Sequence, residues 1–329
     1  MPTTKPGRKS FKQVLADLAN EQLPPTPEDL RALSDLHGAQ LAAFRAAWPG
    51  IPAGRRLAIM TDLGELAEDN FEVNIHPAAR AALDDADGLV RAAAIRNLWE
   101  DDGPDLIQPF MATLVHDPSP EARTAAASAL GVYVYLGEME ELPAEVSREI
   151  EEALLNVFAG GDTIEVRRHA LEAVSYSHRP EAADAIAAAL ASAADRLRLS
   201  ALFAMGRNLD RERWGDAVLA ALSHMDPPMR LVAARAAGEL QLPQAVDALG
   251  EMLHDPDPEI QEMSVWALGE IGGEEARNLL QERLAGADEE LTELIDDALA
   301  NAELMDEIAD FNLLDLDADD LDDDLTHLN

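Results

Sequence analysis

The chain has 329 residues and no cysteine, which excludes disulfides, a catalytic thiol and cysteine-ligated zinc. Its 64 acidic residues against 25 basic ones give a formal net charge of −39, which repels nucleic acid and anionic membrane surfaces and attracts basic proteins. Aromatic residues make up 4% of the chain while alanine is frequent, so we expect helices that pack closely over small side chains.

No segment is long and apolar enough to suggest a membrane span or a secretory leader, so a cytoplasmic location is expected. The sequence leaves two explanations of the acidity open. One is a basic partner, and the other is a proteome that is acidic throughout, as in salt-loving organisms.

Residues 1–25 are expected to form a flexible basic arm and a helix that caps the helices after it. Ser10 can accept hydrogen bonds at the start of a helix from Phe11 to about Gln22. Thr26 is expected to start a second helix in the same way. The segment from Leu41 to Trp48 is then expected to pack against that helix.

From about residue 54 onward, one pattern returns every 31 to 35 residues, except for one interval of 44. A period of this length with helical patterning is typical of stacked helix pairs, none of which can bury its apolar face alone. The sequence therefore predicts an all-α solenoid (α/α superhelix) of about eight helical hairpins over residues 26–302. An arginine, here called the anchor, aligns the repeats and is lost at Gln261 and Thr292. The anchors are Arg56, Arg91, Arg123, Arg167, Arg198 and Arg230.

Three rows within the repeat share one face of the anchor helix: one residue before the anchor, three after it and seven after it. All three rows are small or apolar and are predicted to be buried. The row three residues after the anchor reads Ala94, Ala126, Ala170, Ala201, Ala233 and Ser264. Eight residues after the anchor, four repeats have a glycine, which fits either a helix end or a close helix crossing.

Two stretches, from His116 to Gly131 and from His254 to Gly269, each open with His-Asp-Pro and close with Ala-Leu-Gly. They resemble HEAT repeats of the phycobilisome-lyase-like subtype. The resemblance covers residues 54–302 and implies a solenoid in which the anchor helices line the concave side. It implies little about function, because similar proteins include adaptors, pigment lyases, a hydroxylase and scaffolds.

The long interval holds an insertion near residues 132–145, which we expect to be a long loop that covers Tyr133 and Tyr135 or contacts a ligand. Residues 303–329 lose the pattern and become strongly acidic, so a disordered tail is expected, with a linear binding motif as the alternative. Asp315 and Asp317 alternate as in a calcium loop, but the glycine and glutamate of such a loop are missing, so no metal site is predicted.

Aspartates beside the anchors suggest two structural roles. They can cap the anchor helices, and they can pair with the arginines from one repeat to the next. Such pairs fix the register of neighbouring repeats more than they add stability, and we expect this structural ladder rather than anion binding. The acids of the predicted ladder are Asp87, Asp117, Asp162, Asp195, Asp226 and Asp255.

Five residues after the anchor, the side chain points about 150° away from the buried face. That row and its neighbours hold aromatic residues and arginines, the types enriched at binding hot spots. We predict a partner-binding stripe on the concave side, with the alternative that Phe203 and Trp266 pack against the adjacent repeat. The stripe consists of Arg96, Trp99, Glu172, Tyr176, Phe203, Arg235 and Trp266.

The sequence has no nucleophile elbow, P-loop or dinucleotide glycine pattern, and no histidine is followed by glutamate as in the di-iron hydroxylase built on similar repeats. The predicted function is therefore a non-enzymatic scaffold or adaptor. We expect a monomer, without cofactor or metal, that holds a protein or peptide in its groove. The alternative, from the resemblance alone, is a bilin lyase or lyase chaperone acting on a tetrapyrrole-binding protein.

Overall fold

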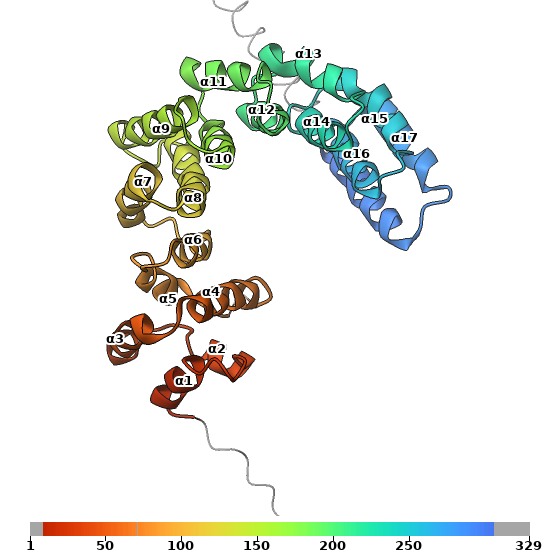
Figure 1. The fold of residues 1–329 in the computed structure, drawn as a ribbon. Coiled ribbons are helices and arrows are strands. Elements are labelled where there is room, and N and C mark those ends of the chain that lie inside the picture. Colours follow the sequence, from red (N-terminus) through yellow and green to blue (C-terminus); the bar gives the residue numbers. More distant parts are fainter. Residues whose placement is uncertain (1–8, 71, 306–329) are drawn as a thin grey trace, which may run out of the picture. The chain divides into compact units, whose positions relative to one another are not determined.

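The computed structural model describes residues 9–70 and 72–305, and within these ranges the chain consists of helices without a strand (Figure 1). The predicted all-α fold is confirmed. Two compact units follow one another in the sequence, and we call the part up to Ser177 unit 1 and the part from His178 unit 2. That both units form one array over residues 26–302 stays a prediction. The predicted basic arm and acidic tail fall mostly on residues 1–8 and 306–329, outside the described residues.

Unit 1 begins with short helices whose starts follow the predicted capping residues. The hydroxyls of Ser10 and Thr26 each accept a hydrogen bond from the backbone amide three residues on, at 3.3 and 3.2 Å. The first helix ends at Leu18, earlier than predicted, where the Asn20 side chain accepts a hydrogen bond from the amide of Gln22 and turns the chain. The elements are α1 (Phe11–Leu18), α2 (Pro27–Arg31), α3 (Gly38–Ala47) and the 3₁₀ turn η1 (Trp48–Gly50).

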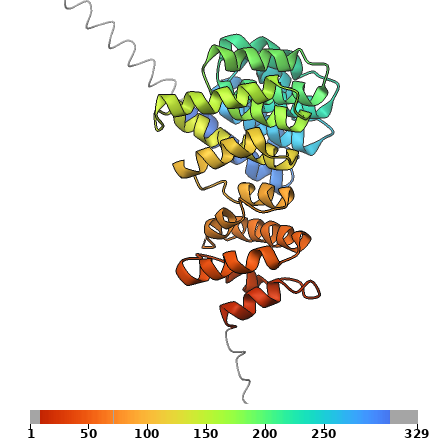
Figure 2. The same cartoon turned by 60° about the vertical axis from the view of Figure 1, so that its left-hand side comes forward.

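The rest of unit 1 consists of helices that stack in chain order, as both views show (Figures 1 and 2). They are α4 (Ala53–Glu68), α5 (His76–Ala81), α6 (Gly88–Arg96), η2 (Pro104–Leu106), α7 (Ile107–His116), α8 (Pro120–Glu138), α9 (Ala144–Ala159) and α10 (Ile164–Val174). The anchor helices α4, α6, α8 and α10 pack each against the next. Helices α7 and α9 form a second layer on one side of them (Figure 1).

Unit 2 repeats this arrangement. Its elements are α11 (Pro180–Leu190), α12 (Asp195–Asn208), α13 (Arg211–Ala221), α14 (Pro227–Glu239), η3 (Pro243–Ala245), α15 (Val246–Met252), α16 (Pro258–Ile271) and α17 (Gly273–Leu284), followed by helical residues 289–305. The anchor helices α12, α14 and α16 pack in succession, and α11, α13, α15 and α17 pack against them. Each unit therefore consists of stacked helix pairs.

The three rows predicted to face inward are buried in both units. In the repeats from Arg91 to Gln261, none of their side chains is more than 6% exposed, and the row three residues after the anchor is completely buried. Its one polar member, Ser264, donates its hydroxyl hydrogen to the carbonyl of Ile260 at 2.7 Å, so no polar group is left without a partner there. Burial of each larger apolar side chain stabilises the fold by about 1.5–3 kcal/mol.

Glycines allow the anchor helices to cross closely. Helix α16 continues past Gly269 to Ile271, and a Cβ at Gly269 would lie 3.0 Å from the Cα of Ala298. A Cβ at Gly238 would likewise lie 3.0 Å from the Cα of Ala267. Of the two explanations that the sequence offers for these glycines, the close crossing applies.

The insertion near residues 132–145 lengthens two helices, which differs from the long loop expected. Helix α8 has 19 residues and α9 has 16, whereas α14 has 13. The helical period continues through the insertion, so Tyr133 and Val134 extend the buried face. The Tyr133 hydroxyl donates a hydrogen bond to the carbonyl of Gly103 at 3.0 Å, which ties the extension to the loop before α7.

Candidate interaction surfaces

A row of partly exposed side chains follows the anchor helices of each unit, five residues after the anchor position. Arg96 is exposed in unit 1, while Phe203 and Arg235 are half-buried in unit 2. Trp266 is 38% exposed, and Trp99, just beyond the end of α6, is 63% exposed. Large rings that remain open to water are typical of contact surfaces.

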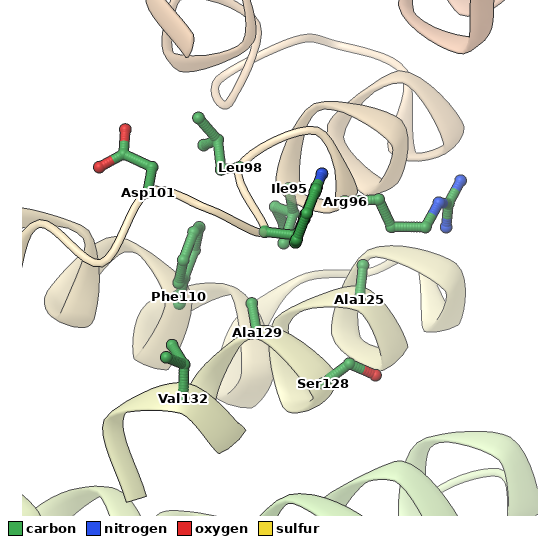
Figure 3. A pocket seen from close by; sticks show the side chains of 10 residues that line it. Ile95, Arg96, Leu98, Asp101, Phe110, Ala125, Ser128, Ala129 and Val132 are labelled. Atoms are coloured by element: carbon green, nitrogen blue, oxygen red, sulfur yellow. The ribbon is translucent and has the colours of Figure 1, made fainter. Parts of the chain in front are cut away.

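Trp99 borders a mostly apolar pocket of about 200 Å³ between α6 and α8. Its walls include Ile95, Phe110 of α7, and Val132 of α8 (Figure 3). Figure 3 shows the Arg96 side chain extending away from Phe110 and Val132, so its guanidinium lies at the rim of the pocket. The pocket has room for one large apolar side chain.

A second pocket, of about 210 Å³, lies between α4 and α6 and shares Arg96 and Trp99 with the first. Helix α4 contributes Glu65 and Glu68, which are both exposed. Neither carboxylate, nor the Arg96 guanidinium, has a hydrogen bond or ion pair with another residue in the described part of the chain. Trp99 is thus flanked by an apolar pocket on one side and an acidic pocket on the other.

The other two stripe residues of unit 1, Glu172 and Tyr176, are half-buried and held by neighbouring side chains. The Glu172 carboxylate lies 3.2 Å from Arg168 and 3.4 Å from Nδ1 of His169. Burial lowers the pKa of His169 below its ordinary value, although the Glu172 carboxylate acts in the opposite direction. The Tyr176 ring contacts Tyr135 edge-on, with ring centroids 5.5 Å apart. These two residues contribute to packing as well as to the surface.

In unit 2 the predicted stripe is partly packed and partly open. The Phe203 ring stacks with two guanidiniums, at 4.2 Å from Arg207 and 5.0 Å from Arg235. Trp266 lies against Gly238 of the preceding anchor helix, where an added Cβ would approach its ring to 2.7 Å. Both rings therefore contact a neighbouring repeat, as the alternative interpretation expects, and Trp266 still has an exposed edge.

Arginine–aspartate pairs, one of them buried and three half-buried, connect successive repeats. Each guanidinium donates two hydrogen bonds to one carboxylate: Arg56 to Asp85 at 2.7 and 2.8 Å, Arg91 to Asp117 at 2.7 and 2.6 Å, Arg123 to Asp162 at 2.8 and 2.7 Å, and Arg230 to Asp255 at 3.1 and 2.8 Å. Arg91 and Arg123 also donate to a carbonyl six residues earlier in their own repeat, at 2.6 and 2.7 Å. One side chain thus joins two inter-repeat turns.

Hydrogen bonding keeps two of these acids, Asp85 and Asp117, ionised. Burial alone would raise the pKa of Asp85, but the hydrogen bonds from Arg56, from the amide of Asp87 and from the Trp48 indole hold it below the usual value. The same balance of burial against hydrogen bonds lowers the pKa of Asp117. The carboxylates of Asp85 and Asp117 are therefore ionised at neutral pH.

The partner of Arg56 is Asp85, which the predicted ladder did not include, whereas Asp87 has the capping role that the sequence also allowed. Asp87 caps α6, because its carboxylate accepts a hydrogen bond from the amide two residues later at 2.9 Å. The sequence holds a signal for the correct residue: Asp85, Asp117 and Asp255 all stand six residues before the next anchor position.

Other residues of the predicted ladder make local contacts. Arg198 pairs with Asp195 in the first turn of its own helix, where the carboxyl group is 79% exposed. Arg167 donates to the carbonyl of Phe158 at 2.7 Å and lies over its ring. Asp226 occupies the N-cap position of α14 without a side-chain hydrogen bond to the helix.

Sequence reasoning missed Glu65, Glu68 and Phe110. The two glutamates are on the α4 face that meets α6, and Phe110 comes from a second-layer helix, so only the packing of different repeats brings them to Trp99. Within the described ranges, no three histidine or acidic side chains are grouped to hold a metal ion. No helix there has the length and apolar character needed to cross a bilayer.

The family model described as HEAT repeats matches residues 77–144 and 215–300. No curated protein matches the chain significantly. Among solved structures, the CpcE–CpcF complex of phycocyanin lyase from Nostoc sp. PCC7120 is 17% identical, with 91% of this chain and 98% of that chain covered and a TM-score of 0.48. Yeast importin-beta (Kap95p) is 14% identical, with 89% and 43% covered and a TM-score of 0.45. Human deoxyhypusine hydroxylase is 20% identical, with 79% and 95% covered and a TM-score of 0.34. Likenesses at these TM-scores say nothing about what this chain does.

Proposed function

Because the chain is a HEAT-repeat protein, we propose that it is a non-enzymatic scaffold that binds a protein or peptide along the exposed rows of its anchor helices. Stacked repeats of this kind present long surfaces to which a partner can bind in an extended form. The partner is basic, because a chain with a net charge of −39 attracts cations and repels its own copies. For the same reason the scaffold acts as a monomer.

The observation that supports this proposal most directly is a difference in exposure between two side chains at the C-terminal end of α6. Ala94 is completely buried, whereas Trp99, five residues later, is 63% exposed beside two pockets. The hydrophobic effect disfavours an open indole, so the fold itself gains little from this side chain. A partner that covers the ring would gain roughly 1.5–3 kcal/mol from it.

The test compares what the full chain captures from a cell lysate with what its variants capture. Trp99→Ala and Trp266→Ala each remove an exposed ring from one unit, and Met225→Ala, which removes a side chain that is 94% exposed in an inter-helix turn, is the matched control. We expect Trp99→Ala to lose a specific partner while keeping its helicity and melting temperature, and Trp266→Ala to lose it while keeping its helicity but with a lower melting temperature, because the Trp266 ring also packs against α14. Equal capture by all four proteins, or equal loss in the Met225→Ala variant, would overturn the proposal.

A further inference from the structure

We propose that the surface around Trp99 is a binding site for an extended peptide segment that carries one large apolar side chain and one lysine or arginine about three residues apart. This inference rests on the proposed function and specifies the chemistry of one partner site in unit 1. The apolar side chain enters the pocket between α6 and α8, and the cation enters the pocket between α4 and α6.

The apolar half of the site follows from the walls of the first pocket. Ile95, Phe110 and Val132 come from three different helices and leave about 200 Å³ open beside the exposed Trp99 ring. An aliphatic or aromatic side chain placed there would be in contact with apolar groups on several sides. Figure 3 shows that the Arg96 side chain extends away from Phe110 and Val132, so its charge does not enter this apolar space.

The basic half follows from charge. Glu65 and Glu68 contribute two carboxylates to the second pocket, and neither is neutralised by a cation in the described ranges. Arg96 lines the same pocket, so the local charge is one negative unit in excess, within a chain that is strongly acidic. A lysine or arginine on the partner would complete this pocket and could lie against the Trp99 ring.

Arg96 has a separate role in this site. A guanidinium carries five N–H donors and no acceptor, and that of Arg96 has no acceptor in the described part of the chain. An extended peptide offers a line of backbone carbonyls. Arg96 lies at the boundary between the two pockets, where it can donate to these carbonyls while both side chains of the peptide are bound.

The spacing comes from the helix packing. The two pockets lie on opposite sides of α6, in successive grooves between anchor helices, and packed helices are roughly 8–10 Å apart. A peptide in the polyproline II conformation advances about 3.1 Å per residue and presents every third side chain on the same face, so side chains that reach successive grooves are about three residues apart.

The test uses synthetic decapeptides of glycine and serine that carry one leucine and one arginine at different separations. Binding to the full-length protein is followed by the NMR signal of the Trp99 indole N–H, which the Trp99→Ala variant identifies among those of the four tryptophans. We expect the largest affinity near a separation of three and about tenfold weaker binding when glutamate replaces the arginine.

Matched variants distinguish the effect of the two pocket glutamates on binding from the effect of the negative charge of the whole chain. Glu65→Gln/Glu68→Gln should weaken binding about tenfold, whereas Glu145→Gln/Glu149→Gln, two exposed residues of α9 with the same change in charge, should leave it unchanged. Equal effects of both pairs, no dependence on separation, or no shift of the Trp99 signal with any peptide would overturn the inference. Loss of capture by Trp266→Ala would still stand in that case, so the proposed function can survive the failure of this site.

Discussion

Replacing Asp85 with alanine tests whether the arginine–aspartate pairs hold successive repeats together. The Asp85 carboxylate is 2% exposed and accepts hydrogen bonds from two nitrogens of Arg56, from the Trp48 indole at 2.7 Å and from the amide of Asp87 at 2.9 Å. The variant would leave the Arg56 guanidinium, itself 9% exposed, buried without a counter-charge. Removal of one partner of a buried pair costs roughly 3–5 kcal/mol. We expect a loss of that size in the free energy of unfolding.

The assay is urea unfolding followed by circular dichroism, with Asp195→Ala as the control. Asp195 also pairs with an anchor, but its carboxyl is 79% exposed, so its loss should have a much smaller effect. A double variant, Arg56→Met/Asp85→Leu, should recover stability because no charge then stays buried. A loss of less than about 1 kcal/mol in Asp85→Ala would refute the reasoning.

The same pair should respond to acid. Because the pKa of Asp85 is lower in the folded chain than in the unfolded one, its contribution is complete above the unfolded pKa of about 4. It is lost as the pH falls through the folded pKa. The difference in stability between the wild type and Asp85→Ala should therefore shrink below about pH 4, as unfolding curves at several pH values would show.

Two further substitutions test the packing by thermal and urea unfolding. Gly269→Ala should destabilise unit 2, because overpacking against Ala298 costs about 1–3 kcal/mol and outweighs a gain of about 1 kcal/mol in helix propensity. Gly54→Ala should instead stabilise α4, because there is open space around Gly54. If both variants were stabilised, the close crossing would be wrong. Tyr133→Phe should cost about 0.5–1.5 kcal/mol through the lost bond to Gly103, and an unchanged midpoint would contradict that bond.

The periodicity of the sequence predicted the inward-facing rows because burial follows the helical period directly. It did not predict the course of the insertion. Gly137 and Pro143 indicated a loop, but burial of Tyr133 beside Phe110 of α7 outweighs the weak helix propensity of Gly137, and α8 continues to Glu138.

The surface was predictable only in part, for a related reason. The helical angle placed Arg96 and Trp99 away from the core, and both are exposed. Which side chains pair depends on contacts between repeats, and the helical angle within one repeat does not specify those contacts. Thus Asp85, the partner of Arg56, was missing from the predicted ladder, and the contacts of Glu172 with Arg168 were not foreseen.

The extra turns of α8 have a mechanical consequence. Through Tyr133 this helix is fastened to the loop before α7, and through Tyr135 it touches Tyr176 beyond the end of α10. A long helix that contacts the segments on both sides of it resists changes in their relative orientation. If a bound partner deforms unit 1, the shorter helices nearer the N-terminus should therefore change their relative positions most. The segment around α8 should move as one rigid group.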